Sequence, residues 1–255
     1  MAETINLGNS YWAVKDNSLL AYNDENGNYK PLPFDFTRAS TATVVNKEGL
    51  IETVSSGEPR IDYSNDAKGA LLLEPQSTNL ITYSEDFSDS SWVKENVTVQ
   101  SNTETSPDGF LNASYVIPNI GSGLTPRINY GFSSQSGVTY QSSIFVKKFN
   151  IDWIRVLSTG ATGNTIQAYY DISNGVIGTS DNSELATIED YGNGWYRLGL
   201  KIVSTNTSSG ATFRVQFAGG DGNPIITTDG TEKFICWGAQ LEQNSYATSY
   251  IPTLT

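Results

Sequence analysis

The sequence predicts an all-β protein: an antiparallel jelly-roll β-sandwich over residues 81–255, preceded by a strand-rich N-terminal arm or subdomain over residues 1–80. Aromatic residues are abundant, with 14 Tyr, 10 Phe and 5 Trp among 255 residues, and Gly, Ser, Thr and Asn separate them. This composition is typical of short strands joined by turns. The chain has no heptad pattern and no internal repeat, so neither a coiled-coil shaft nor a β-helix is expected.

The first 80 residues contain short apolar runs that we expect to form strands. These runs lie at 11–14, 18–22, 42–45, 50–54 and 70–74. A turn is expected between the third and fourth runs, where Gly49 can adopt a positive φ. Pro75 ends the fifth run, because proline cannot donate to a strand ladder.

From residue 81 onward, apolar or alternating runs are separated by turn-forming clusters, the spacing expected of a sandwich. Nine strands are predicted, at 97–100, 111–117, 128–132, 140–148, 153–158, 166–172, 196–204, 211–217 and 234–241. Strict alternation along the last strand would place Ile235, Trp237, Ala239 and Leu241 on one side, and we expect Trp237 and Leu241 to face the core.

The last strand carries the motif WGAQLE at 237–242, followed by ATSYIPT at 247–253. This pair resembles the closing strand of a β-sandwich module found in phage virion proteins and carbohydrate-binding modules. GNGWYRL at 192–198, FDFTRASTATVVNKEGLIE at 34–52 and LLLEPQSTNLITYSEDFS at 71–88 fit the same group. The resemblance implies a tail fibre, head fibre or capsid decoration protein with a lectin-like module. It also implies a homotrimer, made in the bacterial host cytoplasm and located in the virion.

Charge and composition exclude several classes of function. The formal net charge of −12 argues against binding nucleic acid or an anionic membrane surface. The absence of histidine removes Ser-His-Asp triads and histidine-based zinc sites. No run is long enough to span a bilayer, and the N-terminus has no secretory signal pattern. The single Cys236 lies in an apolar strand and is expected to be a buried thiol.

Alternation along four predicted strands separates an apolar side from a side that carries Trp, Tyr, Arg and Gln. The second side is our hypothetical glycan-binding face, because aromatic planes stack on sugar rings while amide and guanidinium groups bond to hydroxyls. It comprises Trp153, Arg155, Gln167, Tyr169, Trp195, Arg197, Arg214 and Gln216. The alternative is a plain solvated face, with Trp195 folded inward by the Gly-Asn-Gly turn before it.

A structural calcium site is a further hypothesis, and no other cofactor is expected. Asp221, Asn223 and Asp229 offer the oxygen ligands that calcium prefers. The alternative is that these residues belong to ordinary Asp-Gly turns, and no EF-hand loop is present.

We therefore predict a non-catalytic virion component that binds glycans. Two alternatives stay open: a structural capsid or tail decoration protein without a sugar ligand, and a glycan hydrolase or lyase that uses a pair of carboxyl groups.

Overall fold

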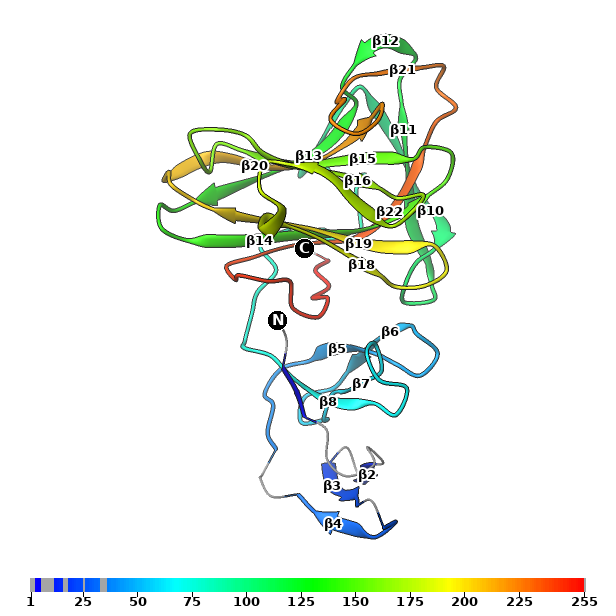
Figure 1. Cartoon of the computed structure of the whole chain (residues 1–255), viewed down its shortest axis with the longest axis vertical. Coiled ribbons are helices and arrows are strands. Elements are labelled where there is room, and N and C mark those ends of the chain that lie inside the picture. Colours follow the sequence, from blue (N-terminus) through cyan, green and yellow to red (C-terminus); the bar gives the residue numbers. More distant parts are fainter. Residues whose placement is uncertain (1–2, 6–11, 16–17, 25, 33–35, 255) are drawn as a thin grey trace. The chain divides into compact units, whose positions relative to one another are not determined.

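The computed structural model describes residues 3–5, 12–15, 18–24, 26–32 and 36–254 (Figure 1). The chain divides into two compact units. The smaller unit comprises Met1–Gln76, Pro107–Gly109 and Thr248–Ile251, and the larger unit comprises Ser77–Ser106, Phe110–Ala247 and Pro252–Thr255. The division falls after Gln76, whereas the sequence interpretation placed it at residue 80. In the described segments, no helix has the length and apolar character needed to cross a membrane.

The larger unit contains two six-stranded antiparallel sheets, which lie face to face (Figure 1). The sheet that we call the β14 sheet has the order β10 (Val97–Thr105), β11 (Leu111–Pro118), β22 (Phe234–Glu242), β14 (Thr139–Lys148), β19 (Trp195–Val203) and β18 (Ala186–Asp190). The β20 sheet has the order β17 (Val176–Ser180), β16 (Ile166–Asp171), β15 (Trp153–Thr159), β20 (Ser208–Ala218), β13 (Arg127–Ser134) and β9 (Trp92–Glu95). The predicted antiparallel β-sandwich is confirmed.

The core lies between these two sheets and is built from alternate residues of their strands. Its largest fully buried members include Trp92, Tyr170, Phe213 and Phe217. All nine strands predicted for this unit are present. The prediction missed β9, β17 and β18, and it also missed β12 (Gly121–Leu124) and β21 (Ile226–Thr228), which pair in a separate two-stranded sheet. These strands have three to five residues, too few for a clear alternation.

The face assignment along β22 was wrong for its first half. Phe234 and Cys236 face the core, whereas Ile235 and Trp237 lie on the opposite side. The register against β14 shifts between the partners of Ser143 and Phe145, and Gly238 there has a φ of +61°. Such a bulge inserts one extra residue and reverses the alternation. Ala239 and Leu241 therefore face the core as predicted.

Two of the quoted motifs meet at this bulge. Asn79, from the 71–88 stretch, donates from Nδ2 to the carbonyl oxygen of Ala239 at 3.0 Å, and its Oδ1 accepts from the amide of Leu241 at 3.0 Å. The amide of Ala239 donates to the carbonyl oxygen of Ser84. The Asn79 side chain thus stabilises the β22 backbone after the bulge. Burial of Cys236 is confirmed, and it raises the pKa of this thiol well above its usual value.

The smaller unit consists of short antiparallel sheets. β8 (Ala70–Leu73) pairs with β1 (Glu3–Ile5) and β7 (Ile61–Asp62), β3 (Ser18–Asn23) pairs with β2 (Trp12–Lys15) and β4 (Tyr29–Pro31), and β5 (Ala42–Val45) pairs with β6 (Ile51–Val54). The strand expected at 11–14 begins at Trp12, and Tyr11 lies outside the described residues. Within this unit, Thr43 Oγ1 donates to the carbonyl oxygen of Tyr250 at 2.6 Å.

Candidate glycan-binding face

The outer face of the β20 sheet, the side turned away from the core, carries a polar band that crosses five strands. Register between neighbouring strands sets its side chains in two adjacent rows. The first row is Glu95, Arg127, Gln216, Arg155 and Tyr169. The second row is Val93, Asn129, Arg214, Leu157 and Gln167. Residues two apart on a strand share a side, so both rows point the same way.

Arg155 is held at the middle of this face by two neutral amides. Its Nε donates to Gln167 Oε1 at 2.7 Å, and its Nη1 donates to Gln216 Oε1 at 3.3 Å. Gln167 Nε2 donates to Asp181 Oδ1 at 3.3 Å, and Gln216 Nε2 donates to the carbonyl oxygen of Pro224 at 2.7 Å. Because each amide is itself anchored, the guanidinium group is fixed in orientation.

Two more arginines lie on the next two strands of the sheet, Arg214 on β20 and Arg127 on β13. Arg214 donates from Nε to Thr212 Oγ1 at 2.9 Å, and Arg127 forms an ion pair with Glu95. Arg155 and Arg214 are half-buried, and neither forms an ion pair with a described carboxylate. Burial lowers the pKa of both guanidinium groups below the ordinary value, and the charge of Arg127 lowers the pKa of Arg214 further. The centre of the face thus holds two partly desolvated cations with no described carboxylate at ion-pair distance, while the more distant Asp181 and Glu95 act to raise the pKa of Arg155 and Arg214 respectively.

The six residues predicted on this sheet do share one side, but two of them are buried instead of exposed. Tyr169 is 3% exposed and Gln216 is 2% exposed. The Arg155 guanidinium lies over the Tyr169 ring at 5.7 Å from its centroid. Trp153 is half-buried. Gly178 packs closely against its ring, because a Cβ added at this glycine would stand 2.6 Å from the ring. Arg155, Arg214, Gln167 and Trp153 are half-buried, so each is more accessible to a ligand than the buried Tyr169 ring is.

Trp195 and Arg197 do not belong to this face. Both lie on β19 in the β14 sheet, and each is 3% exposed. Arg197 Nε donates to Ser143 Oγ at 3.1 Å, and its guanidinium lies 5.3 Å from the centroid of the Phe145 ring. The turn before Trp195 has positive φ at Gly192 and Gly194. The expectation that these two side chains are exposed beside Trp153 was wrong.

The three residues predicted to bind calcium instead accept hydrogen bonds from backbone amides. Asp221 Oδ1 accepts from the amide of Thr179 at 2.6 Å, and Asn223 Oδ1 accepts from the amide of Ile225 at 3.1 Å. Asp229 Oδ1 accepts from the amide and hydroxyl of Thr231, and these bonds lower the pKa of Asp229. In the described part of the chain, no group of three or more Asp, Glu, His or Cys residues could hold a metal. The alternative of ordinary turns fits the local contacts of Asn223 and Asp229, whereas Asp221 instead connects its loop to Thr179 on β17.

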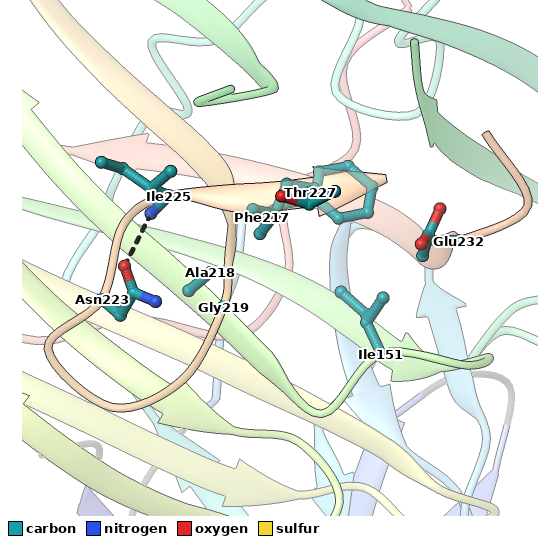
Figure 2. Close-up of a pocket in the computed structure, with 9 residues that line it drawn as sticks. Ile151, Phe217, Ala218, Gly219, Asn223, Ile225, Thr227 and Glu232 are labelled. Atoms are coloured by element: carbon teal, nitrogen blue, oxygen red, sulfur yellow. Dashed lines mark hydrogen bonds between the residues drawn. The ribbon is translucent and has the colours of Figure 1, made fainter. Parts of the chain in front are cut away.

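A pocket of about 370 Å³ lies where the segment after β20 folds back (Figure 2). Ile151, Phe217 and Ile225 line it with apolar surface, and Glu232 is the only titratable residue among its nine lining residues. Thr228 Oγ1 donates to the Glu232 carboxylate. This lining does not supply the two carboxyl groups that glycoside hydrolysis usually requires.

Sequence reasoning missed Arg127, Asn129, Glu95 and Asp181. Ile128 is the apolar first residue of the predicted strand at 128–132, and alternation from it could have placed Arg127 and Asn129 on the outer face. Asn129 Nδ2 donates to Glu95 Oε1 at 2.6 Å. Glu95 and Asp181 lie on or beside short strands that the sequence did not reveal.

No protein-family model and no curated protein sequence matches this chain. Among solved structures, the enzymatically active domain of tailspike protein 4 from bacteriophage CBA120 is 11% identical, with a TM-score of 0.40, over 64% of this chain and 21% of that chain. The CBM22-1 xylan-binding domain of Paenibacillus barcinonensis Xyn10C is 13% identical, with a TM-score of 0.39, over 69% of this chain and 100% of that chain. TmCBM61 in complex with β-1,4-galactotriose is 13% identical, with a TM-score of 0.38, over 66% of this chain and 100% of that chain.

This chain thus spans about a fifth of the tailspike structure that it matches. Likenesses at these identities and TM-scores define neither the ligand nor the activity of this chain.

Proposed function

We propose that the larger unit is a non-catalytic glycan-binding module, and that its ligand lies across the outer face of the β20 sheet. The observation that carries this proposal is the orientation of Arg155 between Gln167 and Gln216 on a half-exposed sheet face. Guanidinium and amide groups held by their neighbours are suited to hydroxyl recognition, because little side-chain entropy is lost when a ligand binds.

The arrangement supports binding along an extended ligand. The two rows continue over β16, β15, β20 and β13, so successive sugar units could contact successive strands. Trp153 lies next to this band on β15, opposite Ala218 and Asp171. Its half-buried ring supplies apolar surface at the end of the band.

The test is a glycan array probed with the purified full chain, followed by calorimetric titration of the glycans that bind. Arg155→Ala and Gln167→Ala should each weaken binding by about tenfold, since each removes one anchored hydrogen-bonding group. The matched control is Lys201→Ala, which removes a half-buried cation on β19 in the other sheet. Equal affinity in all four proteins would place the ligand elsewhere.

The same experiment addresses the two alternative functions. A chain that binds no glycan on the array would favour a structural decoration protein. Release of reducing ends from any bound glycan would favour a hydrolase and contradict the non-catalytic assignment. Near-native thermal unfolding of each variant is the control for folding.

We further propose that this module belongs to a phage virion and assembles as a homotrimer. The support is the resemblance of the 237–242 and 247–253 motifs to closing strands of virion modules. Light scattering on the purified chain measures its mass in solution, and a stable monomer at high concentration would contradict the trimer. Absence of the protein from purified phage particles of its source would contradict the virion location.

A further inference from the structure

On the outer face of this strongly acidic protein, two arginines have no described carboxylate at ion-pair distance. The chain has 27 Asp and Glu residues against 15 Lys and Arg, so carboxylates are plentiful. Arg127, a third half-buried arginine on this face, does form an ion pair with a carboxylate, that of Glu95. Arg155 and Arg214 instead contact neutral acceptors, namely the amides of Gln167 and Gln216 and the hydroxyl of Thr212.

These two arginines are close enough to act together. Arg155 lies opposite Gln216, and Arg214 lies opposite Leu157, so the two arginines are diagonal neighbours on adjacent strands. Diagonal neighbours on one side of a sheet stand ~7–8 Å apart at their Cα atoms, within reach of long side chains. A single planar oxyanion between them would receive donors from both guanidinium groups.

Acidic groups flank the two arginines on both sides. Glu95 lies on the edge strand β9, next to Arg127. Asp181 lies beyond the other end of the band, where its Oδ2 accepts from the amide of Gln167 at 3.0 Å. The cationic centre therefore extends over adjacent strands only, and a ligand with a charge on every unit would meet like charges at the flanks.

From this arrangement, and resting on the proposed glycan-binding function, we infer that the face binds a sparsely charged acidic glycan: a largely neutral chain that places one carboxylate between Arg155 and Arg214. Neighbouring neutral units contact Gln167 in the band and Trp153 next to it. A densely charged polyanion binds more weakly, because Glu95, Asp181 and the net charge of −12 oppose it.

The probes for the test are matched pairs that differ in charge on one backbone. Two pairs compare an acidic glycan with its neutral form: glucuronoxylan with the same polymer after carboxyl reduction, and sialylated oligosaccharides with their desialylated forms. A third pair compares sparse with dense charge: partly methyl-esterified pectin with polygalacturonate. Heparin and alginate represent dense polyanions. Binding of the full chain is measured by titration at low and at high salt.

The expected result is binding to at least one sparsely acidic probe, with about tenfold loss when its carboxylate is removed or when salt is raised. Arg155→Gln and Arg214→Gln should each remove most of the preference for the acidic form over its neutral counterpart. Glu95→Gln should raise the affinity for heparin or polygalacturonate, because it removes a flanking negative charge. Lys201→Ala should bind as the wild type does.

Each contrary outcome is decisive. Equal binding of the acidic and neutral members of a pair would overturn this inference and leave glycan binding intact. Preference for heparin or alginate over every sparsely acidic probe would overturn the role of the flanking acids. Binding to no probe, charged or neutral, would overturn this inference together with the proposed function.

Discussion

Phe145 and Trp237 lie opposite each other on β14 and β22, with ring centroids 5.4 Å apart and an interplanar angle of 58°. Both are at most 1% exposed, yet neither belongs to the core between the two sheets. Tyr191 meets the Phe145 ring edge-on at 4.8 Å. The larger unit thus has a second buried aromatic cluster, on the outer side of the β14 sheet.

Trp237→Ala should lower the free energy of unfolding by ~3–5 kcal/mol, the range for large aromatic side chains whose removal leaves a cavity. Chemical denaturation measures this loss. Val203→Ala is the control, because Val203 is 51% exposed on β19 of the same sheet and its truncation should cost less than ~0.5 kcal/mol. A loss at Trp237 as small as that of the control would mean that this cluster contributes little.

Gly238→Ala tests the bulge that separates the two sides of β22. Gly238 has a φ of +61°, a conformation that strains a residue with a Cβ, so we expect a loss of ~1–2 kcal/mol. Gly131→Ala is the matched control, since Gly131 lies in β13, where a Cβ would meet no atom within 4 Å. If both variants unfold at the same denaturant concentration, the bulge does not require glycine.

The bulge also marks where sequence reasoning succeeded and where it failed. Composition and spacing predicted the sandwich and its nine longest runs, because each core strand repeats apolar residues at every second position. Alternation placed Arg155, Gln167 and Arg214 correctly on one side. It failed for Ile235 and Trp237, before Gly238, since one inserted residue reverses the pattern and a lone glycine does not show whether a bulge forms.

Exposure within the site could not be predicted for a different reason. Gln216 is buried because the segment after β20 folds back and places the Pro224 carbonyl oxygen against its amide. That segment has no periodicity from which its path could be read. The same limit applies to Trp195 and Arg197, whose outward direction from the core was predicted but whose burial was not.

Glu74→Gln should destabilise the smaller unit strongly. Glu74 and Arg60 form an ion pair with side-chain exposures of 5% and 8%, and Glu74 Oε1 accepts from the amide of Ser249 at 2.8 Å. Removing the charge leaves Arg60 buried without its counter-ion, a change that costs ~3–5 kcal/mol in other proteins. Hydrogen exchange over β5 to β8 measures the loss within this unit.

Asp152→Asn provides the comparison for that variant. Asp152 pairs with Lys148 at 2.6 Å, but its side chain is 59% exposed, so its loss should leave hydrogen exchange unchanged. Equal protection of β5 to β8 in Glu74→Gln and wild type would show that the buried pair does not stabilise the smaller unit.

Tyr115 should make the folding stability of the larger unit depend on pH in the alkaline range. Its hydroxyl donates to Glu104 Oε1 at 2.6 Å, and this bond, with a smaller contribution from burial, raises the pKa of Tyr115 from 10.0 to about 12. The folded state therefore favours the protonated phenol. The resulting stabilisation is complete below pH 10 and is lost as the pH rises to about 12.

Tyr115→Phe removes this bond but keeps an aromatic ring beside Lys233, whose Nζ lies 4.4 Å from the ring centroid. Wild type should be more stable than the variant by a constant amount below pH 10, and the difference should shrink between pH 10 and about 12. Urea denaturation at a series of pH values measures it, with Tyr29→Phe as the control at a side chain that is 59% exposed. A difference that stays constant over the whole range would show that Tyr115 keeps its proton equally well in the unfolded chain, and the Glu104 bond would then have no part in alkaline stability.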